Sequence, residues 1–394
     1  MNKDKKLRPE LSFPEFKNDG EWQKKILEDV LDYERPDNYI VSDTNYQNEG
    51  IPVLTANKSF ILGYTQEKFG IYNNLPAIIF DDFTVDSKYV DFPFKVKSSA
   101  IKILTPKKKD NLKFIYELIS QIRFEAKEHK RYYISEYQKI ELPFPLPNEQ
   151  QKIASCLTSL DEVITAHSQK LELLKDHKKG LMQNLFPQEG EKLPKYRFKE
   201  FEKDGVWVEK KLGEIGEPLM CKRIFKEQTT TNPNNGIPFY KIGTFGKLAD
   251  AYISIELYEE FKSKYSFPKK GDILISASGT IGRLVIYDGS PAYFQDSNIV
   301  WLGNDEKLVL NEFLYHCYSI VNWQTSDGGV ISRLYNSDLK NIDVKFPKNP
   351  KEQQKIASCL SSLDDLIKAQ AEKIEQLKLH KKGLMQGLFP KVNI

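Results

Sequence analysis

The stretch Glu149–Pro187 reads EQQKIASCLTSLDEVITAHSQKLELLKDHKKGLMQNLFP, and it returns at Glu352–Pro390 as EQQKIASCLSSLDDLIKAQAEKIEQLKLHKKGLMQGLFP. About 28 of the 39 positions are identical, whereas the segments of about 150 residues before each copy are mostly unlike one another. A repeat of this kind sets the architecture, because each copy is expected to form the same element. Two unlike lobes joined by two near-identical elements predict a chain that recognises two different targets at a fixed separation.

Both copies carry the apolar pattern of a long coiled-coil helix. Leucine and isoleucine recur at alternating steps of four and three over about five heptads, which is a period of 3.5 residues. Each pattern ends at Phe-Pro, because proline cannot continue a helix, so each helix is predicted to be about 36 residues and roughly 55 Å long. The apolar positions are Ile153, Leu157, Leu160, Ile164, Leu171, Leu174, Leu181 and Leu185, then Ile356, Leu360, Leu363, Ile367, Ile374, Leu377, Leu384 and Leu388.

Polar residues interrupt each apolar pattern twice. Lys178 and Lys381 occupy one such position, and a polar residue there fixes the register at a cost in stability. His167 and Gln370 occupy the other, where register-setting and simple filling of a near-surface site remain equally open. Helix starts are predicted from N-caps at Asn148 and at Asn349-Pro350.

Chain connectivity predicts that the two helices run antiparallel. Only Gln188 to Glu191 separate the first helix from the second lobe, so the second helix must return toward the first lobe to pack on its partner. The segment Leu193–Trp207 after the first helix resembles Leu7–Trp22. We therefore expect the N-terminal segment to lie where the second helix ends, which closes the chain into a ring with a pseudo-two-fold axis.

The lobes have the pattern of an α+β fold, with short apolar runs bounded by Gly, Pro and Asn and one helical stretch near the end of each lobe. The predicted domains are residues 1–147, 148–187, 188–350 and 351–394, in the order lobe, helix, lobe, helix. Predicted strands are Ile51–Thr55, Ala77–Phe80, Ala100–Leu104 and Ile140–Leu146 in lobe one, and Ile237–Ile242, Asp272–Ser276, Leu284–Tyr287, Asn298–Leu302 and Ile342–Phe346 in lobe two; predicted helices are Leu112–Phe124 and Glu312–Trp323.

Composition indicates an ordinary globular chain of two to three domains, with 40% hydrophobic and 29% charged residues over 394 positions. The four cysteines lie far apart, so neither a zinc site nor a disulfide framework is expected. We expect a cytoplasmic protein, because the first residues resemble neither a secretory signal nor a membrane anchor.

Charge gives no support to a general nucleic-acid binder, because the net charge is only +3. Residues 1–147 are about balanced, and residues 192–350 are positive by about two. Any binding site must then be a local patch. Lys107–Lys109 and Lys127–Tyr133 are candidates, although a solvated face is the simpler interpretation of each.

Searches for catalytic motifs find no credible active site. The stretch Gly271–Gly282, GDILISASGTIG, has a serine- and glycine-rich loop but lacks the lysine of a P-loop and the spacing of GxGxxG, so it does not predict a nucleotide site. Gly279 and Gly282 are equally well explained as residues that shape a tight turn. Asn232–Asn235 begins like the NPPY-type motif of adenine methyltransferases but lacks its second proline and its aromatic residue, so we interpret it as a turn.

Taken together, the chain resembles the DNA-specificity subunit of type I restriction–modification systems. The resemblance rests on the two EQQKIA…HKKGLMQ…LFP helices, the two LxxxxFxxF…W segments, and GDILISASGTIG with Gln295–Val300, QDSNIV, after it. It covers essentially the whole chain. Lobe one departs from the pattern, since it has only Leu75–Phe83 and Lys88–Phe94 in a comparable place.

The resemblance implies a non-catalytic subunit in which each lobe is a target-recognition domain that reads one half of an asymmetric bipartite DNA site. The paired helices would set the number of unread base pairs and dock two methyltransferase subunits. No cofactor is expected on this chain, because S-adenosylmethionine would come with those subunits. The resemblance also allows for restriction subunits that translocate DNA and cut it.

Polar, basic and aromatic residues in the loops are the candidates for reading bases, because Arg and Lys favour guanine while Asn and Gln favour adenine. Two alternatives stay open: a coiled-coil scaffold that presents two ligand-binding lobes without DNA, and a self-contained nuclease or methyltransferase. The candidate readers are Asn57, Lys58, Tyr64, Lys68, Lys88 and Tyr89 in lobe one, and Lys241, Ser276, Ser278, Thr280, Arg283, Gln295, Ser297 and Arg333 in lobe two.

Overall fold

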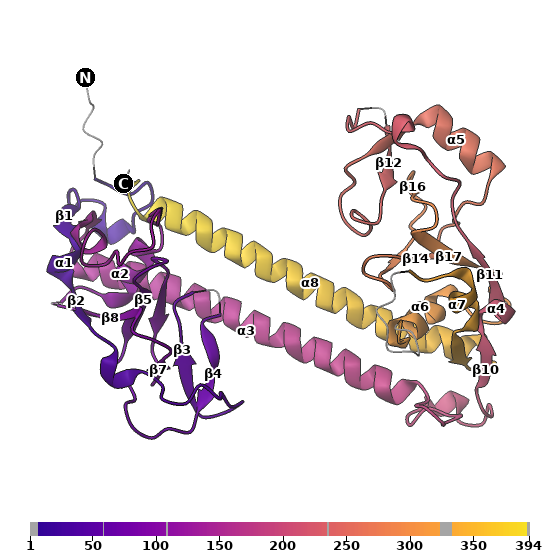
Figure 1. Ribbon diagram of the computed structural model, residues 1–394, viewed down its shortest axis with the longest axis horizontal. Helices are drawn as coiled ribbons and strands as arrows, with labels where there is room; N and C mark the ends of the chain where they lie inside the picture. The colour runs from indigo at the N-terminus through magenta and orange to yellow at the C-terminus, as the bar shows by residue number, and fades with distance from the viewer. Residues whose placement is uncertain (1–6, 58, 108, 235, 324–332, 392–394) are drawn as a thin grey trace. The chain divides into compact units, whose positions relative to one another are not determined.

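The computed structural model describes residues 7–57, 59–107, 109–234, 236–323 and 333–391 (Figure 1). Its internal contacts divide the chain into two compact units: unit one is residues 1–169 with 371–394, and unit two is residues 170–370. Each unit holds one lobe and one half of each long helix. The mixture of sheets and helices in each confirms the predicted α+β class.

The two repeated segments form the long helices α3 (Pro147–Leu185) and α8 (Pro350–Leu388), each of 39 residues. The cap of α8 is confirmed, because the Asn349 side chain accepts a hydrogen bond from the Lys351 amide at 3.0 Å. The predicted cap of α3 is wrong. That helix begins at Pro147, whose fixed φ suits a first helical position, so Asn148 already lies in the first turn.

Within each unit, the halves of α3 and α8 pack antiparallel, as connectivity predicts. In unit one, Ile153 and Leu157 near the start of α3 share a buried cluster with Leu388 near the end of α8. In unit two, Ile356 and Leu360 near the start of α8 share a cluster with Leu185 and its neighbours near the end of α3. The apolar residues near the ends of the helices are therefore core positions in both units, whereas some of those in the middle, such as Ile164 and Leu174, are half-buried.

The lobes have the same strand topology. Each contains a four-stranded sheet, β2-β8-β5-β6 or β11-β17-β14-β15, a three-stranded sheet, β4-β3-β7 or β13-β12-β16, and a two-stranded pair, β1-β9 or β10-β18. The strands of lobe one are β1 (Gln23–Ile26), β2 (Leu31–Glu34), β3 (Ile51–Leu54), β4 (Ile61–Thr65), β5 (Ala77–Asp81), β6 (Ser87–Val90), β7 (Lys95–Val96), β8 (Ile101–Pro106) and β9 (Glu141–Phe144). Those of lobe two are β10 (Val208–Lys211), β11 (Gly216–Leu219), β12 (Gly236–Tyr240), β13 (Tyr252–Ser254), β14 (Ile273–Ser276), β15 (Leu284–Ile286), β16 (Tyr293–Phe294), β17 (Ile299–Asn304) and β18 (Asp343–Phe346).

This common topology shows which segment of lobe one corresponds to GDILISASGTIG of lobe two, although the two sequences differ. The central strand β5, from LPAIIFDDF, takes the place that β14, from GDILIS, takes in lobe two, and every other strand has a counterpart. The predicted strands all fall on observed ones. The lobe helices α2 (Leu112–Ile119) and α6 (Asn311–Ile320) also correspond, but both end earlier than predicted.

The remaining α-helices are short, and the longest of them, α5, has no counterpart in the part of lobe one that the structure describes. These short helices are α1 (Leu27–Val30), α4 (Leu212–Ile215), α5 (Ile255–Lys264) and α7 (Asn336–Asn341).

After α6 ends at Ile320, the chain turns back, so that the Trp323 indole donates to the Tyr318 carbonyl at 3.2 Å.

The N-terminal segment lies where α8 ends, as predicted. The Leu11 amide donates to the Gly387 carbonyl at 2.8 Å, and Trp22 packs edge-on against Phe389 with ring centroids 6.3 Å apart. Unit two repeats both contacts, since the Tyr196 amide donates to the Asn184 carbonyl at 2.9 Å and Trp207 packs edge-on against Phe186 at 6.0 Å. The echo between the two segments is therefore a repeated capping of the helix ends.

The lysines inside the apolar ladders are paired with acids of the facing helix. Lys178 forms an ion pair with Asp364, and Lys381 pairs with the equivalent Asp161 at 2.7 Å. Among the described residues, only the second pair is extended, because Lys381 also reaches the buried Glu117 of α2 at 3.1 Å, and Lys113 pairs with both acids. These contacts support the register-setting role of the two lysines.

We expect Lys381→Met to destabilise the protein more than the matched Lys178→Met. Methionine keeps the apolar stem in both cases, but loss of Lys381 leaves Lys113 to balance two acids, one of which is 2% exposed. The expected loss of unfolding free energy is about 2–3 kcal/mol for Lys381→Met and about 1 kcal/mol for Lys178→Met. Urea unfolding monitored by circular dichroism measures both, and equal losses would contradict the role given to Glu117.

Candidate nucleic-acid interface and docking surfaces

The loop after β14, residues 277–283, is closed by a buried serine. The Ser276 hydroxyl donates to the Thr280 carbonyl at 2.6 Å and accepts from the Arg283 amide at 2.7 Å. Gly279 and Gly282 have φ values of +64° and +80°, which favour glycine. The turn-forming interpretation of both glycines is thus supported, and Ser276 is a structural residue of the loop rather than an exposed one.

Hydrogen bonds join this loop and Arg333 to the segment between β16 and β17. Ser278 donates to the Asn298 side chain at 2.9 Å, and Arg333 donates to the Ser297 carbonyl at 2.7 Å. Gln295 accepts from the Ile242 amide at 2.9 Å, which fastens the chain that follows β12.

The other predicted readers of lobe two belong to the same group. Arg283 donates to the Phe245 carbonyl at 2.9 Å, and the neighbouring Lys241 pairs with Asp250 at 2.8 Å. Thr280 is exposed at the tip of the loop. Lobe two therefore gathers its eight predicted residues at one set of loops, which we call the lobe-two loop face: residues 241–245, 276–283, 295–298 and 333.

Arg223 also reaches the lobe-two loop face, and the sequence did not single it out. Its Nε donates to Asp296 at 2.9 Å, while its side chain stays 61% exposed. It lies after β11, far from the other loops in sequence, in the unremarkable stretch MCKRIFK. Arg223 reaches this face because β11, which precedes it, pairs with β17.

Lobe one does not bring its predicted residues together in the same way. Lys58 lies outside the described residues. Asn57 and Lys68 are exposed on either side of β4, and Tyr64 is half-buried within that strand. Lys88 and Tyr89 lie on β6.

Tyr89 packs against α2. Its ring centroid lies 5.8 Å from that of Tyr116, and the Lys113 amine lies 5.2 Å from its ring centre. Burial raises the pKa of its hydroxyl. This position favours a packing role for Tyr89.

The counterpart of the lobe-two loop face in lobe one is formed by other residues. The Asp82 amide donates to the Ala100 carbonyl at 2.8 Å, as Ala277 does to Asn298 at 2.7 Å in lobe two. Arg131 donates to the Ser99 carbonyl at 3.3 Å, and this bond corresponds to the bond from Arg333 to the Ser297 carbonyl in lobe two. Sequence reasoning reached Arg131 only as part of the basic run Lys127–Tyr133.

Within that run, the lysines are neutralised by local acids. Lys127 pairs with Glu125 at 3.5 Å, and Lys130 pairs with Glu136 at 2.9 Å. In the other basic patch, Lys107 pairs with Asp32 at 3.6 Å. These lysines fit the solvated interpretation.

The exposed faces of the long helices are identical at both ends of the repeat. Residues 151–159 of α3 correspond to 354–362 of α8, and residues 177–183 correspond to 380–386. Within these ranges, every position that is exposed in both helices carries the same residue type in both. The exposed differences fall between 162 and 176, for example Thr165 against Lys368. Some of these residues make the same contacts in both units, since Lys152 pairs with Glu15 and Lys355 pairs with Glu200. The identical exposed pairs at these ends are Gln151/Gln354, Lys152/Lys355, Ser155/Ser358, Ser159/Ser362, His177/His380, Lys179/Lys382 and Gln183/Gln386.

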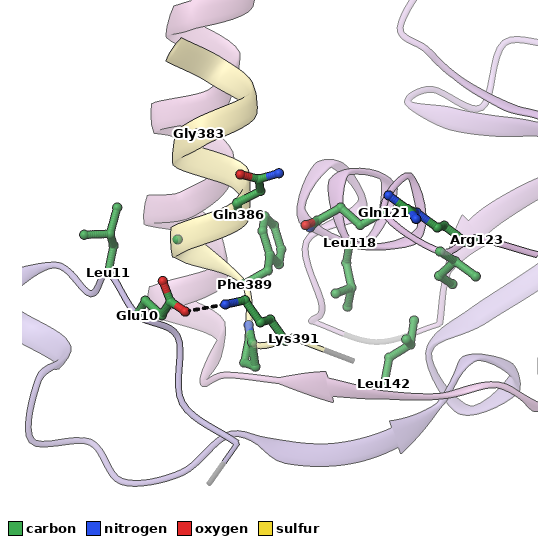
Figure 2. A pocket seen from close by; sticks show the side chains of 13 residues that line it. Glu10, Leu11, Leu118, Gln121, Arg123, Leu142, Gly383, Gln386, Phe389 and Lys391 are labelled. Carbon is green, nitrogen blue, oxygen red and sulfur yellow. Dashed lines mark hydrogen bonds and ion pairs between the residues drawn. The ribbon is translucent and has the colours of Figure 1, made fainter. Parts of the chain in front are cut away.

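Each unit has a groove beside the Phe-Pro end of a long helix. In unit one it measures about 1030 Å³, and Figure 2 shows Leu118, Leu142 and Phe389 around it, with the Glu10–Lys391 ion pair at its edge. In unit two, grooves of about 510 and 580 Å³ meet at Phe186 and Pro187. Gln386 and its equivalent Gln183 line the two sites.

Two kinds of site were also sought and not found. No group of three or more metal-binding side chains occurs among the residues that the structure describes. Within the same residues, no helix combines the length and the apolar character needed to cross a bilayer.

Comparison with known proteins identifies the family. The sequence model of the type I restriction modification DNA specificity domain matches residues 19–176 and again 205–379. The chain belongs to this family. The two matches coincide with the two lobes and most of the helix that follows each, so the internal repeat is a repeat of the family domain.

Individual relatives agree over most of their length. The chain is 38% identical to the predicted type I restriction enzyme specificity subunit S.HindORF215P of Haemophilus influenzae, over 82% of each chain. It is 30% identical to the EcoR124I/EcoR124II specificity subunit of Escherichia coli, over 92% of each. The crystal structure of the S subunit from M. genitalium has the same fold, with a TM-score of 0.68 and 18% identity over 98% of this chain and all of that one.

We expect Gly282→Ala to destabilise lobe two far more than Gly279→Ala. Both residues have positive φ, which costs about 1 kcal/mol for alanine. At Gly282 a Cβ would also lie 2.3 Å from the Trp323 ring, whereas at Gly279 the nearest atom is 3.8 Å away. The expected losses of unfolding free energy are about 3 and about 1 kcal/mol, measured by urea unfolding. Equal losses would mean that Trp323 moves aside freely.

Proposed function

We propose that this chain is the DNA-specificity subunit of a type I restriction–modification complex, in which each lobe reads one half of an asymmetric bipartite site. The observation that carries the proposal is the pair of family domains with a common strand topology but unlike loop residues. Two equal readers would recognise a symmetric site, whereas two different loop faces suit two different half-sites. Base reading is assigned to loop side chains that reach the major groove.

The lobe-two loop face supports reading of a defined sequence. Its loops are fixed by hydrogen bonds from Ser276, Ser278 and Gln295, so its exposed side chains are held in place before DNA arrives. Pre-organised groups lose less entropy on binding. Arg223 and Thr280 are exposed there, and arginine is the usual partner of guanine.

The long helices are proposed to dock two copies of one methyltransferase subunit. Exposed residues at the helix ends are the same in both units, although the lobes beside them have diverged. A single partner surface that binds twice explains this identity. The groove at each Phe-Pro end lies beside these residues and offers an apolar contact.

In this proposal, chemistry belongs to the partners. The methyltransferase subunits would bring S-adenosylmethionine and flip the target adenine out of the duplex, and restriction subunits could join the same cytoplasmic complex. The helices, about 58 Å long at 1.5 Å per residue, would set the number of unread base pairs. The alternative of a scaffold without DNA finds no support among the relatives.

Methylome sequencing tests the proposal directly. The chain is co-expressed with its methyltransferase subunit in a host that lacks adenine methylases, and a single motif of two unlike half-sites around a constant spacer is expected. Thr280→Ala, at an exposed loop tip, should relax one half-site and leave the other unchanged, because each lobe reads alone. Lys264→Ala on the exposed face of α5 is the control. Methylation without a bipartite motif, or none from a well-formed complex, would contradict the proposal.

Charge reversal at the repeated helix surface tests the docking of two partners. We expect Lys179→Glu or Lys382→Glu to reduce the complex from two methyltransferase subunits to one, and the double variant to lose both. Lys368→Glu is the matched control, since this exposed lysine lies on α8 but its counterpart is Thr165. Native mass spectrometry counts the subunits. A loss caused by Lys368→Glu, or retention of two subunits by the double variant, would refute this surface.

A further inference from the structure

One arginine occupies the same place in both lobes. Arg131 and Arg333 each donate to a backbone carbonyl of the segment before β8 or β17, those of Ser99 and Ser297. The residue after each arginine is fixed in the same way, because the Tyr132 amide donates to Asp82 and the Leu334 amide donates to Ala277. The equivalence therefore rests on matched hydrogen bonds rather than on sequence alignment.

In lobe one this arginine forms an ion pair with Asp82 and lies over the Phe83 ring, but neither contact explains why lobe two also has an arginine at this place. In lobe one, the buried Asp82 lies 3.6 Å from the buried Lys102, and Arg131 lies slightly farther from Asp82, at 3.8 Å. In lobe two the Asp82–Lys102 pair is replaced as a whole by Ala277 and Val300, yet the arginine is retained. The arginine is thus retained in lobe two although its acidic partner is lost, so the contact that both lobes share is its bond to the loop carbonyl.

The guanidinium also has donors to spare. An arginine carries five N–H donors in a planar fork, and among the residues that the structure describes the loop carbonyl accepts from one of them in each lobe. The Arg131 side chain is 49% exposed. A partly exposed, anchored guanidinium with free donors matches the geometry of a phosphate group.

We propose that Arg131 and Arg333 are a matched pair of phosphate-contacting residues that seat each lobe on the DNA backbone and do not read bases. This inference rests on the proposed function, because it assumes two lobes that read different half-sites. A residue kept in both lobes has no power to distinguish those half-sites. It must instead contact a feature that both half-sites have, and the sugar–phosphate backbone is common to every duplex. Arg333, predicted from sequence as a base reader, is thereby reassigned.

The test measures the salt dependence of DNA binding by the complete complex with its methyltransferase subunits. Each phosphate contact contributes about 0.9 to the slope of log K against log salt. We expect Arg131→Gln and Arg333→Gln each to reduce that slope by about 1, to weaken binding about eightfold at 0.1 M salt, and to leave the methylated motif unchanged. The double variant should lose about 2 from the slope. Glutamine removes the charge and keeps a polar N–H donor.

Lysine variants separate charge from structure. Arg131→Lys and Arg333→Lys should retain the wild-type slope, and thermal unfolding should show that every variant is folded. An unchanged slope in the glutamine variants would overturn the proposal in favour of a loop-holding role. Relaxation of one half-site in the methylated motif would overturn it in favour of base reading, as would a response from only one of the two arginines. If the wild-type complex itself shows no motif-specific, salt-dependent binding, the proposed function fails instead.

Discussion

A glutamine in the first turn of each long helix attaches the lobe to the helix. Gln150 accepts from the Asn111 amide at 2.9 Å and donates to the Pro145 carbonyl at 3.0 Å. Gln353 accepts from the Leu310 amide at 2.8 Å and donates to the Leu308 and Pro347 carbonyls. Both side chains are at most 1% exposed, so loss of these bonds would leave buried polar groups unsatisfied at a cost of about 1–3 kcal/mol each.

These bonds explain why the helices stay alike while the lobes diverge. All three partners of Gln353 are backbone atoms, and backbone amides and carbonyls are present whatever side chains the lobe carries. The helix must keep its glutamine, but the lobe can change its sequence freely at the same contact. Gln150 differs in one of its three bonds, which goes to the Asp110 side chain at 2.8 Å and not to a backbone carbonyl.

The sequence alone is sufficient to predict the two long helices, because an apolar period of 3.5 residues sustained over about five heptads is specific to coiled-coil helices. It misplaced the start of α3, since Asn148 is a good capping residue that lies one position beyond Pro147. Within the lobes, it located the strands and the lobe-two loop face. It did not identify the equivalent face of lobe one, because Asp82, Ser99 and Arg131 are brought together only by hydrogen bonds between distant segments.

The central hairpin of each lobe shows why that equivalence is hidden. In lobe two, Ser276 closes the seven-residue loop 277–283 with its hydroxyl. In lobe one, Asp81 closes the five-residue loop 82–86, its carboxylate accepting from the Phe83 and Thr84 amides at 2.9 and 3.0 Å. The loop after the central strand is therefore held by a hydroxyl in lobe two and by a carboxylate in lobe one, and the two loops differ in length. A reading loop can thus change in length and sequence while the strands beneath it, and the glutamine that anchors the lobe, remain in place.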